Sequence, residues 1–276
     1  MKVRCWGARG SIAVSGPEYV RHGGDTPCLE LRSSGGEVLV VDAGTGIRRL
    51  GNLLVREGRN RLSLLFTHSH WDHIVGFPFF KPIYDPKAHI RMLGCPGFQG
   101  EVSKILAMAM RAPLFPVPFE GLSARLEPSS WCSAALDVDT IRVTRIALSH
   151  PNMGAGYRFT EKGRSVVFLT DNELSHHHRG GRSFEEYVAF CKGADLLIHD
   201  AEYLPEEYPE RKGWGHSHLL DAARLAREAG VGALGLFHHN QDRTDAEVDA
   251  MVDRCRAALG GACDCLALTQ YSEFTF

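Results

Sequence analysis

The stretch LLFTHSHWDHIVGFPFF, residues 64–80, decides how this sequence is interpreted. It begins as a short apolar strand and then places His68, His70, Asp72 and His73 within six positions. In an extended segment residues i and i+2 point the same way, so His68 and His70 can hold one metal ion. If the chain then turns into a helix, Asp72 and His73 point to a neighbouring position. Neutral imidazole and carboxylate groups are ligands for zinc and similar divalent ions.

The alternative interpretation of this stretch is a polar loop with a hydrogen-bonded cluster. Burying several such groups without an ion to coordinate costs free energy, so the pattern favours a metal site. Two metals about 3.5–4 Å apart would need roughly this many ligands and a bridging carboxylate besides.

The overall composition is that of an ordinary globular protein. Of the 276 residues, 44% are hydrophobic and 23% are charged, and the formal net charge is −2. This balance provides no broad basic surface, which disfavours nucleic acid as a partner. The start does not resemble a signal peptide, and no run of about 18 apolar residues occurs. We therefore expect a cytoplasmic protein that does not span a membrane.

The eight cysteines show neither zinc-ribbon spacing nor a compact disulfide pattern, which predicts reduced and mostly buried thiols. The C-x-C pair at Cys263 and Cys265 is by itself a weak signal for a metal or redox site. The 14 histidines are more informative, because they cluster.

The order of predicted elements indicates one layered α/β domain over residues 1–276. Strands come first and strand–helix alternation follows, with no linker between the two regions. Ser217 is a plausible N-cap, and Thr244 with Glu247 forms a capping-box pair. The predicted strands cover 2–7, 28–33, 38–44, 62–68, 89–94, 140–150, 165–171, 195–203 and 232–240. The predicted helices cover 100–112, 184–194, 217–230 and 244–261.

The segment Thr67-His68-Ser69-His70-Trp71-Asp72-His73 resembles the T-H-x-H-x-D-H signature of the metallo-β-lactamase superfamily. The similarity spans nearly the whole chain. The resemblance implies a four-layer αββα sandwich, with two mixed sheets inside and helices outside.

The same resemblance implies a ligand set, because the family's later ligands follow strand ends. His150 follows RIAL, Asp171 follows VVFL, and His238 follows LGL. Asp42, in VLVVDAGTG, resembles the family's aspartate that orients a ligand rather than binding metal. By the resemblance, one metal is held by His68, His70 and His150, and the other by Asp72, His73 and His238, with Asp171 bridging them.

His239 is a rival to His238 as the last ligand. The family's ligand falls two residues after the last strand leucine, here Leu236, which favours His238. His239 would then orient a ligand or face the substrate.

Zinc is the first choice for both metals, with manganese or iron as alternatives. Two such ions would lower the pKa of a bridging water from near 15.7 to about 7 and so supply hydroxide. Asp72 would then be needed both as a ligand and for catalysis.

Two features narrow the branch of the superfamily. The histidine at position 70 disfavours the diiron oxygen-reducing branch, which uses glutamate there. The stretch GWGHSHLLDAARLAREAGVGALGLFHH, residues 213–239, resembles the His-Ser-Thr region of the phosphodiesterase branch, which includes tRNase Z and the cyclic-phosphate phosphodiesterase of phosphonate breakdown. By this resemblance His216 donates a proton or binds phosphate. The alternative is a solvent-facing ring at a helix start, and His218 departs from the threonine common in the family.

We therefore expect a phosphodiesterase acting on a small phosphodiester, such as a cyclic nucleotide. A tRNA-processing nuclease is weakened by the balanced charge and by the lack of a basic Gly/Pro-rich arm. The alternatives from other classes are a thioester or lactone hydrolase similar to glyoxalase II, and a non-catalytic metal-bound sensor or accessory protein. A homodimer is compatible with the sequence.

Two further polar groups complete the expectations. The run from His176 to His178 is predicted to be a solvated loop. His199 and Asp200, at the end of a buried strand, are expected to orient the site rather than to bind metal.

Overall fold

The computed structural model describes residues 1–94, 102–131 and 133–276, and within these the strands form two sheets of seven strands each. The first sheet has the order β14-β1-β2-β3-β4-β5-β6 and the second β13-β12-β11-β10-β9-β8-β7. The strands are β1 (Lys2–Gly7), β2 (Cys28–Arg32), β3 (Val38–Val41), β4 (Arg61–Leu65), β5 (His89–Gly94), β6 (Arg125–Ser130), β7 (Ala135–Val138), β8 (Ile141–Ala147), β9 (Ala155–Glu161), β10 (Arg164–Leu169), β11 (Leu196–Asp200), β12 (Ala233–Phe237), β13 (Asp264–Ala267) and β14 (Glu273–Thr275). The α-helices are α1 (Ile47–Arg56), α2 (Trp71–Ile74), α4 (Val102–Ala109), α5 (Phe184–Cys191), α6 (Tyr208–Arg211), α7 (Leu219–Ala229) and α8 (Asp245–Leu259).

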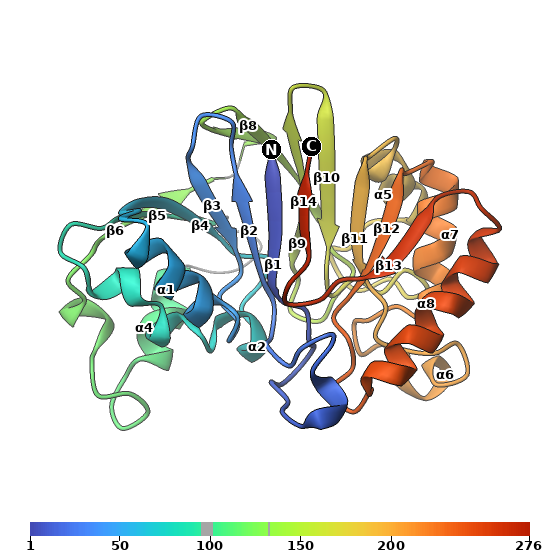
Figure 1. Cartoon of the computed structure of the whole chain (residues 1–276), viewed down its shortest axis with the longest axis horizontal. Coiled ribbons are helices and arrows are strands. Elements are labelled where there is room, and N and C mark those ends of the chain that lie inside the picture. Colours follow the sequence, from blue (N-terminus) through green and yellow to red (C-terminus); the bar gives the residue numbers. More distant parts are fainter. Residues whose placement is uncertain (95–101, 132) are drawn as a thin grey trace.

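Both sheets are mixed and follow the same plan. In the first sheet β3 to β6 pair in parallel and β14, β1, β2 and β3 pair antiparallel. In the second sheet β10 to β13 pair in parallel and β7 to β10 pair antiparallel. Figure 1 shows α1 and α4 outside the first sheet, and α5, α7 and α8 outside the second. The predicted αββα sandwich is confirmed.

Three apolar layers hold the sandwich together. The central layer lies between the sheets and contains Val3, Leu29 and Leu65 from the first sheet with Phe159 and Ile198 from the second. The other two layers lie between each sheet and its own helices. Because the central layer draws on both sheets, it supports our proposal that residues 1–276 form one domain.

Helix ends follow the sequence signals in one case and depart from them in another. Thr244 and Glu247 form the predicted capping box of α8. The predicted N-cap Ser217 is wrong: His218 caps α7 by accepting a hydrogen bond from the backbone N–H of Asp221. The Ser217 hydroxyl instead donates a hydrogen bond to the carbonyl of Asn172, a residue distant in the chain.

Several elements were not predicted. They are α1, whose buried residues Ile47, Leu50 and Leu54 have helical spacing, α6, and the strands β6, β7, β9, β13 and β14. β9 begins at Ala155, soon after the turn at Pro151 and Asn152.

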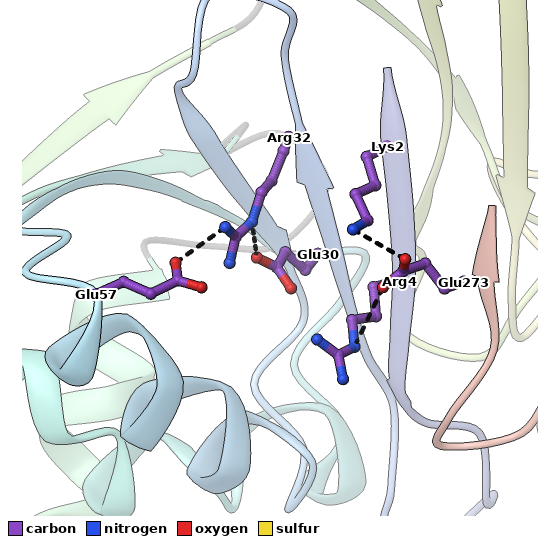
Figure 2. Close-up of a pocket in the computed structure, with 6 residues that line it drawn as sticks. All are labelled: Lys2, Arg4, Glu30, Arg32, Glu57 and Glu273. Carbon is purple, nitrogen blue, oxygen red and sulfur yellow. Dashed lines mark hydrogen bonds and ion pairs between the residues drawn. The ribbon is translucent and has the colours of Figure 1, made fainter. Parts of the chain in front are cut away.

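The outer surface of the first sheet carries a pocket lined by six charged residues, beyond the end of α1 (Figure 2). Glu273 pairs with Lys2 at 2.8 Å and with Arg4 at 3.8 Å, and Arg32 pairs with Glu57 at 2.9 Å and also with Glu30. Three cations thus balance three carboxylates. Each charged side chain that lines this pocket has an ion-pair partner within it, so we assign the ion pairs to the fold.

Six cysteines lie in the described residues; all have free thiols, and five are buried, with Cys263 partly exposed. This agrees with the expected reduced thiols, whereas Cys95 and Cys132 lie outside the described residues. Among the parts of the chain that the structure describes, no helix has both the length and the apolar character to cross a bilayer.

Candidate metal centre

The HxHxDH stretch lies where β4 gives way to α2. β4 ends at Leu65, and a short loop with a bend at Thr67 leads to His70, whose backbone is extended with φ −63° and ψ 157°. Asp72 and His73 lie in the first turn of α2. The predicted change from extended chain to helix after His70 is therefore present. It separates His68 and His70 from Asp72 and His73, so that the two pairs point to adjacent positions.

The later candidates come from the second sheet and meet this stretch at one edge. His150, Asp171 and His238 follow β8, β10 and β12, respectively. These three strands run in the same direction, so their carboxyl ends lie at one edge of the sheet. The ligand atoms of His68, His70, His150 and Asp171 all lie within 4.8 Å of one another, and so do those of Asp72, His73 and His238. These are the two groups that the resemblance implied.

Asp171 lies between the two groups. Its Oδ2 atom is 3.5 Å from Nε2 of His68 and 3.5 Å from Nε2 of His238, and its Oδ1 atom is 3.3 Å from Nε2 of His73. One carboxylate thus faces imidazoles of both groups, the geometry expected of a bridging ligand.

Three residues that follow strands adopt left-handed backbone conformations. Asp42, Asp171 and His238 have φ values of 62°, 56° and 56°. Such conformations cost on the order of 1–3 kcal/mol each and persist only where the surrounding structure enforces them. At each place the turn directs the side chain back toward the cluster.

The cluster contains buried nitrogen atoms with no hydrogen-bond partner. They include Nε2 of His68 and Nε2 of His73, whose rings are at most 3% exposed. Nε2 of His150 also faces Nδ1 of His70 at 3.0 Å. Unpaired buried nitrogen atoms are costly, and a cation bound among them would remove that cost. Imidazole and carboxylate donors at this spacing therefore fit divalent metal ions.

Burial keeps three of the histidines neutral. It lowers the pKa of His68 well below its ordinary value, lowers that of His150 to about 3, and lowers that of His70. Neighbouring imidazolium charge on His73 acts in the same direction at His68. Neutral imidazoles are the form that binds metal.

The other two histidines behave in the opposite way. Burial opposes their protonation, but the carboxylates of Asp72 and Asp171 outweigh it and raise the pKa of His73 and of His238 well above the ordinary value. Without metal, protons on these rings therefore balance the carboxylates. A divalent ion must displace those protons.

Hydrogen bonds on the far side of the rings hold the candidate ligands in place. Nδ1 of His73 donates to Asp42 at 2.8 Å, and Asp42 also accepts from the N–H of Thr67. Nδ1 of His150 donates to the carbonyl of Gly215 at 2.8 Å. Each bond directs the ring's Nε2 atom toward the cluster. That Asp42 orients a metal ligand stays a prediction, and its contact with His73 is consistent with it.

Glu202 was missed by the sequence analysis. Its carboxylate is 4% exposed and accepts a hydrogen bond from Nδ1 of His238 at 2.9 Å. It also accepts from the side-chain amide of Asn240 at 3.0 Å. The sequence signal that could have identified Glu202 is its position two residues after β11, at the same sheet edge as the candidate ligands.

His216 is part of the cluster, not a solvent-facing ring. It is 8% exposed, stacks on His238 with ring centroids 4.7 Å apart, and forms a third group with Asp171 and His238. Its Nδ1 atom lies 3.5 Å from carboxylate oxygens of both Asp200 and Glu202. Burial alone would lower the pKa of His216, but Glu202 and Asp200 outweigh it and raise that pKa to about 9.

His239 is directed away from the cluster, which corrects the expectation that it orients a ligand or faces the substrate. Its Nε2 atom hydrogen-bonds the carbonyl of Leu268 at 2.7 Å, and its N–H donates to the carbonyl of Ala8. Because consecutive side chains diverge at the end of β12, only His238 can face Asp171.

Comparison with known proteins agrees with this geometry. The model of the family described as β-lactamase superfamily domain matches residues 38–239. The chain belongs to this superfamily. Ribonuclease Z of Haloarcula marismortui is 26% identical, over 82% of this chain and 84% of its own. The metallo-β-lactamase fold protein YhfI from Bacillus subtilis superimposes with a TM-score of 0.73, at 17% identity over 99% of this chain and 98% of its own. A diphosphatase from the PhnP family gives 0.71, at 17% identity over 100% and 97%.

Membership of the β-lactamase superfamily and the His/Asp cluster together identify a metal-dependent hydrolase that binds divalent metal ions. The predicted family, fold and enzyme class are confirmed. The matched region runs from the start of β3 to two residues beyond β12, so it contains every candidate ligand.

We expect the binding of zinc to release protons. The carboxylates of Asp72 and Asp171 raise the pKa of His73 and of His238 well above the ordinary value, so protons should leave these rings as the metals enter, and the apparent metal affinity should rise with pH. Calorimetric titration in two buffers of different ionisation enthalpy measures the number of protons released. Identical heats in both buffers would contradict the expectation.

Proposed function

We propose that this metal-dependent hydrolase is a phosphodiesterase with two divalent cations, zinc in the first place, that acts on a small nucleotide-like phosphodiester. In this proposal the first cation is held by His68, His70 and His150, the second by Asp72, His73 and His238, and Asp171 bridges them. The main observation that supports this proposal is that Asp171 faces imidazoles of both groups, while the buried His216 lies against the same cluster. When bound, two such ions would polarise a phosphoryl oxygen and lower the pKa of a water to near 7.

The chain's own residues supply the remaining chemistry. Nδ1 of His216 faces Asp200 and Glu202, so Nε2 is the atom that can donate a proton to the leaving alkoxide. The two carboxylates stabilise the protonated ring. Glu202 also contacts His238, so one carboxylate positions both a proposed ligand and the proposed proton donor.

RNA is the second candidate substrate. Relatives named Ribonuclease Z match most of this chain, which weighs against our expectation that nucleic acid is disfavoured. The net charge of −2 still favours a small substrate, because binding of a long RNA draws on clustered positive charge.

A substrate panel tests the proposal. The zinc-loaded protein is assayed with bis-p-nitrophenyl phosphate, a cyclic nucleotide, a precursor tRNA, a thioester and a lactone. We expect turnover of the first two, lost in Asp72→Ala because Asp72 contacts both His73 and His238. Turnover of the thioester or the lactone alone would overturn the proposal. Cleavage of the precursor tRNA at a higher kcat/KM than that of the small phosphodiesters would indicate RNA as the substrate. Full metal content with no turnover of any substrate would indicate a sensor.

A further inference from the structure

Trp214 is exposed, yet its backbone is held firmly on both sides. Its side chain is 63% exposed. The N–H groups of its neighbours Gly213 and Gly215 donate to the two oxygens of Glu173, both at 2.7 Å. The N–H of Trp214 itself donates to the carbonyl of Arg211 at 3.1 Å. The loop therefore displays the indole ring from a fixed backbone.

Glu173 is a buried anchor for this loop. Its side chain is fully buried, and it also accepts hydrogen bonds from the hydroxyl of Tyr208 and from Nε2 of His178, both at 2.7 Å. Four hydrogen bonds thus converge on one carboxylate, which explains why a charged group is tolerated there. His178 belongs to the run expected to be a solvated loop, and this contact corrects that expectation for His178.

The loop lies directly against the proposed metal site. Gly213 and Gly215 have φ values of 88° and 97°, where a side chain would be strained. A Cβ atom at Gly215 would lie 2.1 Å from Nδ1 of His150, the atom that donates to the carbonyl of Gly215. Trp214 is thus one residue from a group that touches a proposed ligand, and two residues from His216.

A second exposed tryptophan adjoins the same half of the cluster. Trp71 is 58% exposed and stands between His70 and Asp72. His70 and His150 contact each other at 3.0 Å; Trp71 follows His70 in the chain, and Trp214 precedes Gly215, whose carbonyl contacts His150. Exposed indole rings at a rigid site are suited to stacking against a planar ring, and one base–aromatic stack gives substantial binding energy without a need for hydrogen bonds.

We propose that Trp214, with Trp71 beside His70, is a stacking platform for the nucleobase of the substrate. This inference rests on the proposed phosphodiesterase function. It predicts that the ester group that stays on the phosphate after cleavage is a nucleoside, and that its base packs on the indole of Trp214. The rigid GWG loop gives the platform its position relative to the phosphate, because the same loop carries the carbonyl that orients His150.

Two esters with the same leaving group test the platform. The substrates are thymidine 5′-(p-nitrophenyl phosphate) and methyl p-nitrophenyl phosphate, which differ only in the group that remains. We expect the wild type to prefer the thymidine ester. In Trp214→Ala the ratio of the two kcat/KM values should fall by about 5- to 100-fold, mainly through KM, the range that loss of one base–aromatic stack gives. Trp214→Phe should restore most of the ratio.

Tyr271→Ala is the matched control, because Tyr271 is equally exposed at 57%, adjoins no cluster residue in the chain and lies over the guanidinium of Arg49. It should leave the ratio unchanged. A second readout is calorimetric binding of thymidine 5′-monophosphate, which should weaken in Trp214→Ala by a similar factor.

Three results would overturn the platform proposal. The first is a wild type that does not prefer the thymidine ester, and the second is an equal loss of kcat/KM on both esters in Trp214→Ala. The third is a change from dimer to monomer in Trp214→Ala with the ratio preserved, which would place Trp214 at an interface between copies. If the zinc-loaded wild type cleaves neither ester, the phosphodiesterase proposal fails instead. Binding of thymidine 5′-monophosphate then tests the platform proposal independently of turnover. Equal affinity in the wild type and in Trp214→Ala would overturn it.

Discussion

Asp171→Ala should lose bound zinc from both positions and lower kcat/KM on phosphodiesters by more than about 10⁴-fold. The carboxylate lies within 3.5 Å of nitrogen atoms of His68, His73 and His238, so its removal takes one ligand from each group at once. It also leaves the imidazoles of the cluster without their central negative charge. Metal content by elemental analysis and steady-state kinetics on the same preparation measure both effects.

Asp245→Asn is the control for loss of a buried aspartate. Asp245 accepts hydrogen bonds from the backbone N–H groups of Arg21 and His22 and lies outside the cluster. It should lower the melting temperature and keep both metals. Because Asp171→Ala could fail to fold, Asp171→Asn, which preserves the shape, is measured beside it. Two bound zinc ions and activity within tenfold of the wild type in Asp171→Asn would show that the carboxylate does not bridge.

His216→Ala should slow the cleavage of substrates with poor leaving groups by about 10²- to 10⁴-fold, with metal content unchanged. The ring stacks on His238 and faces Asp200 and Glu202, which together stabilise its protonated form. A cyclic nucleotide leaves an alkoxide that needs a proton, whereas p-nitrophenolate leaves without one. The loss should therefore be large on the cyclic nucleotide and less than about tenfold on bis-p-nitrophenyl phosphate.

The difference between the two substrates separates a proton donor from a structural residue. A structural role would reduce both rates alike, and loss of zinc would show that His216 is a ligand. The pH profile gives a second readout: a donor must be protonated, so activity on the cyclic nucleotide should decline at high pH in the wild type, and this decline should vanish in His216→Ala. His218→Ala, which removes the N-cap of α7 two residues away, is the matched control and should cost about 0.5–2 kcal/mol of stability without changing the substrate ratio.

The HxHxDH stretch could be predicted because its information is local. The placement of His68 and His70 just before α2, and of Asp72 and His73 in its first turn, depends on neighbours in the chain. The capping box of α8 is local in the same way. The family resemblance then extended the prediction to His150, Asp171 and His238, each placed after a strand.

The residues that contact the candidate ligands from behind could not be predicted, because nothing in the local sequence distinguishes them. Glu202 follows β11 as many polar residues follow strands, and only the pairing of β11 with β12 brings it to Nδ1 of His238. Glu173 gathers partners from three separate segments. His239 differs from its neighbour His238 only in the direction that the turn after β12 gives each ring.

The sequence by itself determined which side chains could bind metal, that strands would present them, and that the chain follows the metallo-β-lactamase plan. The tertiary structure alone decided which of two adjacent histidines faces the cluster, which carboxylates hold the rings, and that the GWG loop lies against His150. The physical reason is the distance along the chain over which each interaction acts. Strand alternation and helix capping act over a few residues, whereas these buried hydrogen bonds form only where the fold brings segments that are distant in the chain together.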